Sequence, residues 1–142
     1  MNEPDQAGIE RLLSDFAWYA DRGDGASLAR LFVPEAVLVV NGLRLVGHAD
    51  IAQDCQRRAL DPRRKTRHVW SNLRLDPQAD GTVSATAVQL TFEQTDSAAT
   101  RLRINDLTDR YQRDTAGAWR FMSRIIERQM ALELQENHPC QP

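Results

Sequence analysis

The N-terminal part of the chain repeats hydrophobic residues with the period of an α-helix. Apolar positions recur at the i, i+3, i+4, i+7 spacing that places them on one helical face. The residues with this spacing are Ile9, Leu12, Leu13, Phe16, Tyr19 and Ala20. The pattern predicts an amphipathic first helix that follows a polar arm at residues 1–6 and ends near Arg22 and Gly23.

Two shorter helices are expected after the first. Asp24 precedes a helical stretch at residues 26–32, and a carboxylate in that position is a common N-cap. Pro34 is expected to end this second helix, because a proline interrupts helical hydrogen bonding. A third helix is predicted over residues 49–60, and Pro62 follows it.

The rest of the chain alternates apolar and polar residues with the period of a β-strand. Residues 36–40 and 43–46 flank an Asn-Gly pair, which is typical of a tight hairpin. Residues 132–142 are polar and form the expected C-terminal tail. The other predicted strands cover residues 67–75, 82–94, 102–113 and 118–129, with a loop at 95–100.

This order of elements predicts one α+β domain over residues 7–131. The expected architecture is a cone-shaped roll, in which a strongly curved mixed or antiparallel sheet wraps around three N-terminal helices. A sheet of this shape leaves a cavity between itself and the helices. Apolar cavities with a few converging polar groups are typical ligand sites.

Composition and charge exclude several classes of partner. The net charge of −2 argues against nucleic-acid binding. We expect no membrane association, because no apolar run is long enough to span a bilayer and no secretory leader is visible. Cys55 and Cys140 have no neighbouring metal ligands, so we expect free thiols and a cytoplasmic protein. Metal-site spacings and glycine-rich phosphate loops are missing, so no metal or cofactor is expected.

The strand at residues 67–75 carries the first candidate for chemistry. A two-residue period places His68, Trp70 and Asn72 on one face. Histidine changes its protonation state near neutral pH, so His68 can serve as a general acid or base if this face lines the cavity. If the face is packed or solvated instead, His68 is a structural residue held by a neighbouring hydroxyl.

Several segments of the chain resemble the SnoaL-like family. They read Leu-Ala-Arg-Leu-Phe-Val-Pro-Glu-Ala at 28–36, Gly-His-Ala-Asp-Ile at 47–51, Arg-His-Val-Trp-Ser-Asn at 67–72 and Ala-Trp-Arg-Phe-Met-Ser-Arg at 118–124. This family belongs to the nuclear-transport-factor-like superfamily of cystatin-like cone folds. The resemblance covers about residues 6–129 and implies the same fold.

Within this family the chain resembles the scytalone and bile-acid dehydratases most. Those proteins carry a tyrosine and an aspartate at the end of the first helix, a histidine after the third helix, and a late arginine. Tyr19, Asp24, His68 and Arg124 match these positions. The resemblance implies His68 as the acid/base, Tyr19 as a donor to a substrate carbonyl and Asp24 as an orienting acid. From the residues alone, Tyr19 equally fits the core and Asp24 the helix cap.

A second orienting acid is expected on the strand at residues 102–113. The side chains of Asp106 and Asp109 are expected on opposite faces of this strand, so only one of them can point into the cavity. The resemblance favours Asp109. Either acid can instead form a surface ion pair with Arg110 or Arg124.

The remaining candidates are residues expected to bind the substrate. The arginine is a candidate anion-binder or a member of an ion pair, and the aromatic residues are candidate walls that also fit the core. This expected set consists of Arg124, Trp70, Asn72, Trp18, Phe92 and Phe121.

These features predict a cofactor-independent lyase or isomerase of the dehydratase type. It would act by acid/base catalysis on a small cyclic, largely apolar hydroxy or keto compound. Two alternatives stay open: a non-catalytic small-molecule-binding or assembly subunit, and a polyketide cyclase. Besides the small molecule, the expected partner is a further copy of the chain, in a homodimer or higher homo-oligomer formed through the sheet face.

Overall fold

The computed structural model describes residues 1–95 and 99–135 of the chain, except for the side chain of Pro4. The helices are α1 (Glu3–Arg22), α2 (Gly25–Ala29) and α3 (Gly47–Arg58). The strands are β1 (Phe32–Val40), β2 (Leu43–Val46), β3 (Lys65–Pro77), β4 (Val83–Gln94), β5 (Thr100–Arg113) and β6 (Trp119–Leu134).

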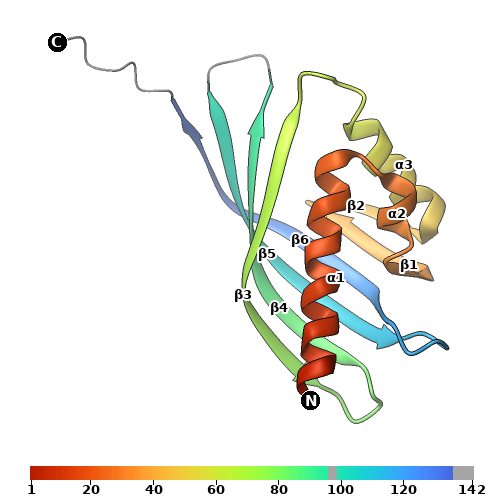
Figure 1. The fold of residues 1–142 in the computed structure, drawn as a ribbon. Coiled ribbons are helices and arrows are strands. Elements are labelled where there is room, and N and C mark those ends of the chain that lie inside the picture. Colours follow the sequence, from red (N-terminus) through yellow and green to blue (C-terminus); the bar gives the residue numbers. More distant parts are fainter. Residues whose placement is uncertain (96–98, 136–142) are drawn as a thin grey trace.

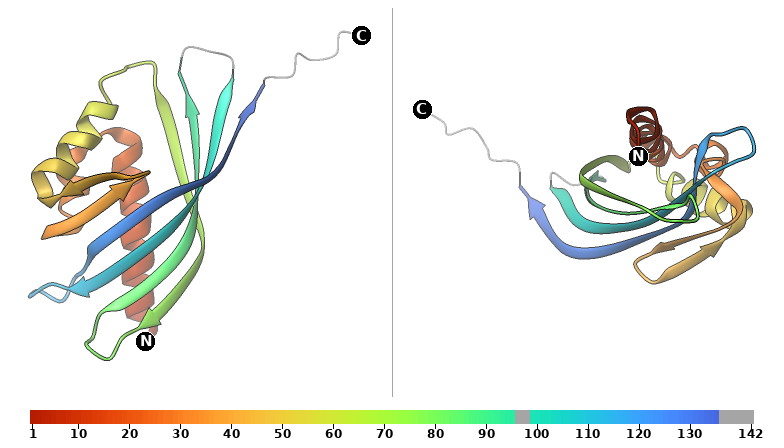
Figure 2. Two further views of the ribbon diagram at one scale, coloured as in Figure 1. Left: turned by 180° about the vertical axis from the view of Figure 1, so that it is seen from behind. Right: turned by 90° about the horizontal axis from the view of Figure 1, so that it is seen from below.

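The strands form one six-stranded sheet in the order β2-β1-β6-β5-β4-β3. Neighbours are antiparallel except β1 and β6, which run parallel. The sheet is strongly curved; α1 lies along its concave side, and α2 and α3 cover the end that holds β1 and β2 (Figures 1 and 2). The predicted α+β cone around three helices is therefore confirmed.

The core lies between α1 and the concave face of the sheet. Ile9, Leu13 and Phe16 are almost fully buried, as their helical spacing predicts. The Phe16 ring meets Phe32 and Phe121 edge-on, with ring centroids 6.2 and 5.9 Å apart. This apolar contact holds α1 against the sheet. It therefore also determines which part of the sheet lies next to the C-terminal end of α1.

The second helix is shorter than predicted, and Pro34 does not end it. Helix α2 stops at Ala29, and Pro34 lies inside β1. The reason is tertiary pairing, because Phe32 already pairs with Phe121 of β6. The register of β1 then shifts between Phe32 and Val37, an irregular stretch where a proline costs no ladder hydrogen bond.

The chain ends also differ from the sequence expectation. Helix α1 already begins at Glu3, with Asn2 as its N-cap, so most of the expected polar arm is helical. Strand β6 continues to Leu134, which converts the first residues of the expected tail into strand. Part of the expected loop at 95–100 and the remainder of the tail lie outside the described residues.

Three bulges change which side chains share a face. In β3 the register shifts between Ser71 and Arg74, where Asn72 has a left-handed φ of 56°. In β6 one extra residue is inserted at Met122 and another at Gln129, as the pairing with β5 shows. Each bulge inverts the in–out alternation beyond it.

None of the described helices is long and apolar enough to cross a bilayer.

Candidate active site

His68 forms a close pair with an aspartate from the end of α1. Its Nδ1 atom lies 2.5 Å from Oδ1 of Asp21, and both side chains are largely buried, with 15% and 4% of their surfaces exposed. The backbone N–H of His68 donates to Oδ2 of Asp21 at 3.1 Å. The Thr66 hydroxyl donates to Oδ1 at 3.0 Å. Three hydrogen bonds from one strand therefore fix the carboxylate, and the carboxylate fixes the imidazole.

The facing surfaces of α1 and β3 bring this pair together. Seven residues before Asp21, Ser14 accepts a hydrogen bond from Nε1 of Trp70 at 3.0 Å. Seven residues are two helical turns, so Ser14 and Asp21 lie on one face of α1. On β3, His68 and Trp70 are two apart and share a face. The helix is thus attached to the strand at two polar points.

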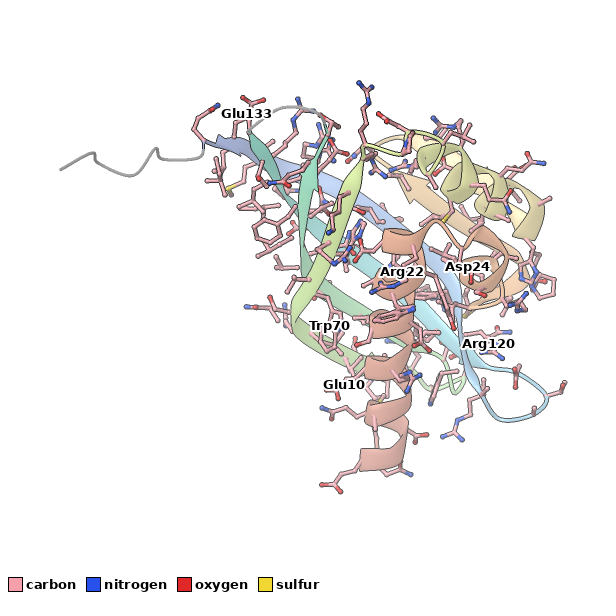
Figure 3. The ribbon with its side chains drawn as sticks, turned by 45° about the horizontal axis from the view of Figure 1, so that its top comes forward. Glu10, Arg22, Asp24, Trp70, Arg120 and Glu133 are labelled. Carbon is pink, nitrogen blue, oxygen red and sulfur yellow. The ribbon has the colours of Figure 1, made fainter. Side chains whose placement is uncertain are left out.

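Asp21 was not among the residues expected from the sequence, which favoured Asp24 as the orienting acid. Asp24 is exposed and caps α2, where its Oδ1 accepts from the Ser27 backbone N–H at 3.1 Å. Hydrogen bonds from the Ser27 side chain and backbone lower the pKa of Asp24, which matches the cap that the sequence also suggested. Figure 3 shows Asp24 at the start of α2, on the far side of the turn from Trp70. The polar pair Ser14 and Asp21, two turns apart on α1, was the signal that could have identified the right acid.

His68 also lines a cavity of about 420 Å³ between the helices and the sheet, called here the central cavity. Its apolar wall comes from the helices, β1 and β6, and consists mainly of Phe16, Leu28, Leu38, Ile51 and Ile126. Its polar wall comes from the sheet and consists of His68, Gln89, Thr91, Glu93, Arg103 and Asn105. Further arginines line it from α3, the following loop and β6.

Sheet register arranges the polar wall in rows. Thr91 pairs with both His68 and Arg103, so these three form one row across β3, β4 and β5. The next row contains Gln89 and Asn105. Because adjacent strands lie about 4.8 Å apart, His68 and Arg103 are separated by roughly 10 Å at the backbone.

Tyr19 does not join His68 in this cavity. Its side chain is half-buried and packs against the core, and the residue is outside the cavity lining. Its backbone carbonyl accepts a hydrogen bond from the backbone N–H of Asp24, and this bond is part of the C-terminal end of α1. The placement matches the core position that the helical pattern also allowed. Its proposed role as a donor to substrate therefore has no support from its position.

Asp109 and Arg124 lie together but away from the cavity. Arg124 donates from Nε and Nη2 to the two carboxylate oxygens of Asp109 at 2.9 and 3.0 Å, and each side chain is only 1% exposed. The Tyr111 hydroxyl donates to Asp109 at 2.6 Å, and burial raises the pKa of this tyrosine far above its ordinary range. Neither Asp109 nor Arg124 lines the central cavity, so both are core residues. Asp106 on the opposite face is exposed.

A bulge in β6 determines which residues are neighbours of Arg124. The extra residue at Met122 places Phe121 and Arg124 on the same buried face. The Arg124 guanidinium carbon lies 4.4 Å from the Phe16 ring centroid and 4.7 Å from that of Phe121. Phe121 is fully buried and lies in this core cluster rather than on the cavity wall.

The other expected substrate-binding residues also lie outside the central cavity. Trp18 and Trp70 line a second groove between α1 and β3, which His68 and Asp21 also line and where the Trp18 ring stacks on Arg22. Figure 3 shows Trp70 beside α1 and Arg22 at the C-terminal end of that helix. Asn72 is exposed, because its bulge removes it from the face that carries His68. Phe92 alternates with the cavity residues Thr91 and Glu93 and points to the other side of the sheet.

Cys55 lines the cavity as a free, buried thiol. Burial raises the pKa of Cys55 to about 11, so the thiolate that would act as a nucleophile is scarce at neutral pH. The second cysteine, Cys140, lies outside the described residues. Within the described ranges, no three His, Cys, Asp or Glu side chains are grouped to hold a metal ion.

The chemical capability of the site therefore centres on His68. An ionised Asp21 carboxylate has no hydrogen to donate, so Nδ1 of His68 carries the shared hydrogen. The lone pair of the neutral ring is then on Nε2, which has no hydrogen-bond partner among the described residues. A buried carboxylate behind an imidazole at a cavity wall is an arrangement suited to proton transfer.

Comparison with known proteins identifies the family. The SnoaL-like domain family matches residues 4–125, and the chain belongs to it. The structure has the nuclear-transport-factor-like cone fold of the proteins that resemble it. No curated protein sequence matches the chain significantly.

Solved structures of the same fold include proteins of different activities. A putative scytalone dehydratase from Novosphingobium aromaticivorans is 18% identical, with a TM-score of 0.81 over 94% of this chain and 89% of that one. Hexachlorocyclohexane dehydrochlorinase LinA-type3 from Novosphingobium barchaimii is 23% identical, with a TM-score of 0.79 over 98% and 96%. ActVI-ORFA from Streptomyces coelicolor is 19% identical, with a TM-score of 0.80 over 89% and 96%. At these identities the likeness concerns the fold.

Proposed function

We propose that the chain is a cofactor-independent lyase or isomerase that acts by proton transfer in the central cavity. Its substrate would be a small, cyclic, largely apolar hydroxy or keto compound. The observation that carries the proposal is the pair formed by His68 and Asp21 at the cavity wall. The cavity volume of about 420 Å³ falls in the range of sites for small organic ligands.

The proposed elimination uses one base and one leaving group. Nε2 of His68 takes a proton from the carbon next to a carbonyl, and the electron pair of that C–H bond forms the new double bond. The leaving oxygen departs with its own bonding pair and receives the proton back from His68, which yields water. Asp21 stabilises the imidazolium between these two steps. An isomerisation would return the same proton to another carbon.

The donor that polarises the substrate carbonyl would come from the cavity wall. Tyr19 was the sequence-based candidate, and it lies outside this wall. Thr91, the cross-strand neighbour of His68, presents a hydroxyl on the wall. Hydrogen-bond donors placed at a developing enolate lower the barrier to its formation.

The test requires a substrate and three variants. Cyclic hydroxy ketones are screened for loss of water by mass spectrometry and by the absorbance of the conjugated product. With a substrate in hand, His68→Ala and Asp21→Asn are each expected to lower kcat about 10²- to 10⁴-fold, the range typical of general acid–base groups. Asp24→Asn is the matched control, because asparagine is also a good N-cap and Asp24 caps α2 outside the cavity lining.

The variants separate the proposal from its alternatives. A folded His68→Ala protein with full turnover would contradict the role of this histidine. Asp24→Asn losing as much activity as Asp21→Asn would contradict the assignment of the orienting acid. Tight binding of compounds that are never converted would favour a non-catalytic ligand-binding protein. Ring closure of a linear polyketide by the same dyad would favour the cyclase.

A further inference from the structure

The central cavity is rich in arginine, although the chain as a whole is slightly acidic. We propose that its ligand is an organic acid whose carboxylate binds between Arg103 and Arg128, opposite His68. This inference rests on the proposed function, because it names the substrate class of the same cavity. The binding it predicts can nevertheless be measured without any turnover.

Charges on the cavity wall do not balance. Arg57 and Arg58 both pair with one acid, Asp54, at 2.6 and 2.9 Å. Arg64 and Arg103 both pair with Glu93, at 2.8 and 3.0 Å. Each group of two guanidinium cations and one carboxylate has a net charge of +1.

Arg128, an exposed residue that lines the cavity, adds a further positive charge, and no described residue is its counter-ion. It lines the cavity, and its side chain makes no ion pair or hydrogen bond with any described residue. The bulge at Gln129 lets Arg128 pair with Asn105 on the cavity face, while Met130 pairs with Ile104 on the opposite face. The backbone N–H of Arg128 donates to Oδ1 of Asn41 at 2.8 Å, which fixes the strand at this point.

Two buried polar atoms in the same wall have no partner among the described residues. They are Nε of Arg103, a donor, and Oδ1 of Asn105, an acceptor. Asn105 is only 4% exposed. Buried groups of this kind cost stability unless something bonds to them, and both belong to residues that line the cavity. A ligand that accepts at Arg103 and donates at Asn105 would satisfy both.

The spacing of these groups describes the ligand further. Arg103 and Asn105 are two residues apart on β5, about 7 Å along the strand. A carboxylate accepts from Arg103 and from Arg128, and a hydroxyl on the same molecule donates to Asn105. The apolar wall of Phe16, Leu38 and Ile126 covers the ring or chain between them. The ligand class is therefore a hydroxy or keto acid with an apolar body.

The experiment compares two probes of the same shape. Trans-4-hydroxycyclohexanecarboxylate and its primary amide are titrated into the full chain by calorimetry at about pH 7, where the acid is ionised. We expect the acid to bind about tenfold or more tightly than the amide, because a charge-assisted hydrogen bond is worth at least one decade in affinity. Sodium phosphate, titrated at the same ionic strength, is expected to bind more weakly than the acid probe.

Three variants assign the effect to residues. Arg128→Gln removes the unpaired charge without leaving a carboxylate alone, and it should weaken acid binding about tenfold while amide binding stays the same. Glu93→Gln removes a negative charge from the wall, so it should strengthen acid binding. Arg74→Gln, at an exposed position of β3 outside the cavity lining, is the matched control and should change neither.

Defined outcomes would overturn the inference. Equal affinities for acid and amide would show that the cavity does not select a carboxylate. Phosphate binding as tightly as the acid would show that it accepts any anion, and an unchanged Arg128→Gln protein would remove that residue from the site. None of these results bears on whether His68 is catalytic, so the proposed function and this inference can fail separately.

Discussion

Arg124 and Asp109 form an ion pair at the centre of the core, where water cannot compensate either charge. Both side chains are 1% exposed, and the pair is bidentate. Pairs of this kind contribute little net stability relative to apolar residues, but breaking one leaves a buried charge alone. The importance of Arg124 at this position is therefore structural.

Arg124→Met tests this role at constant side-chain volume. We expect the free energy of unfolding to fall by about 3–5 kcal/mol, because the Asp109 carboxylate loses the cation paired with it. Adding Asp109→Asn should recover much of the loss, since the amide is neutral and still accepts from Tyr111. Urea denaturation measures all three proteins. Arg110→Met, at an exposed position of the same strand as Asp109, should stay within about 0.5 kcal/mol of the native chain. A similarly small loss for Arg124→Met would contradict the buried-pair account.

At the level of single residues, the sequence identified His68 but not its partner. A two-residue period was enough to select the histidine, since nothing irregular lies between Thr66 and Trp70. The partner depends on which face of α1 lies against β3, and the helical pattern defines only the core face. Asp21 is neither on that face nor beside His68 in sequence, and its two-turn spacing from Ser14 is the one sequence feature that marks the face of α1 packed on β3.

Among the elements, the existence of the strands was predictable, but several of their ends and the facing of their side chains were not. Uninterrupted alternation predicted β4 to within one residue, and its positions Val83, Ala85 and Ala87 share one buried face. The bulges at Asn72, Met122 and Gln129 shift the alternation without a clear sequence signal. Asn72 is the partial exception, because asparagine tolerates the left-handed conformation better than most residues.

Glu93 joins three elements at the rim of the central cavity. It lies on β4 and accepts from Arg103 on β5 and from Arg64 in the segment before β3. Burial, the largest single influence, acts to raise the pKa of Glu93. The hydrogen bonds and the positive charges of Arg103 and Arg64 together outweigh burial, so the pKa of Glu93 lies below its ordinary value.

The shifted pKa of Glu93 predicts how stability depends on pH. A carboxyl with a lower pKa in the folded state stabilises the fold above its unfolded pKa, and this stabilisation is lost as pH falls through the folded value. The difference in unfolding free energy between the native chain and Glu93→Gln should therefore be constant near neutrality and shrink below about pH 4.5. Urea titrations from neutral to acidic pH measure it. A difference that persisted unchanged in acid would show that the charge of Glu93 contributes nothing.

On the scale of the whole molecule, the order of helices and strands in the sequence was enough to predict the fold class. Three helices and an early hairpin followed by long strands leave few arrangements other than the observed cone. The character of the cavity could not be derived in the same way. Its arginines come from α3, the loop after it, β5 and β6, and sequence gives no measure of their convergence.

The end of the sheet that extends beyond the helices has an apolar outer face. Pairing places Leu102 opposite Leu132 and Ile104 opposite Met130, so these side chains share one face. Met130 and Leu132 are 56% and 42% exposed. Figure 3 shows Glu133 in this extension, remote from the helices. Strand β1 pairs with β6 only as far as Ile126. Beyond Ile126, the edge of β6 that faces away from β5 has no partner strand among the described residues.

We propose that a second copy of the chain covers this face. An open strand edge beside an apolar surface favours association. A symmetric contact between two β6 strands would pair the open edges and cover the apolar surface. The net charge of −2 adds little repulsion between copies. The sequence also led us to expect a homo-oligomer through the sheet face, and that expectation stays a prediction.

Sedimentation velocity over a range of concentrations tests the self-association. The native chain should sediment as a dimer or a larger oligomer. Replacing Met130 and Leu132 together by glutamate should raise the dissociation constant about hundredfold or more, because burying unpaired carboxylates is costly. Leu60→Glu is the matched control, since Leu60 is 78% exposed and lies in the loop after α3. A native chain that stays monomeric at every concentration, or a double variant that associates as before, would contradict the proposed interface.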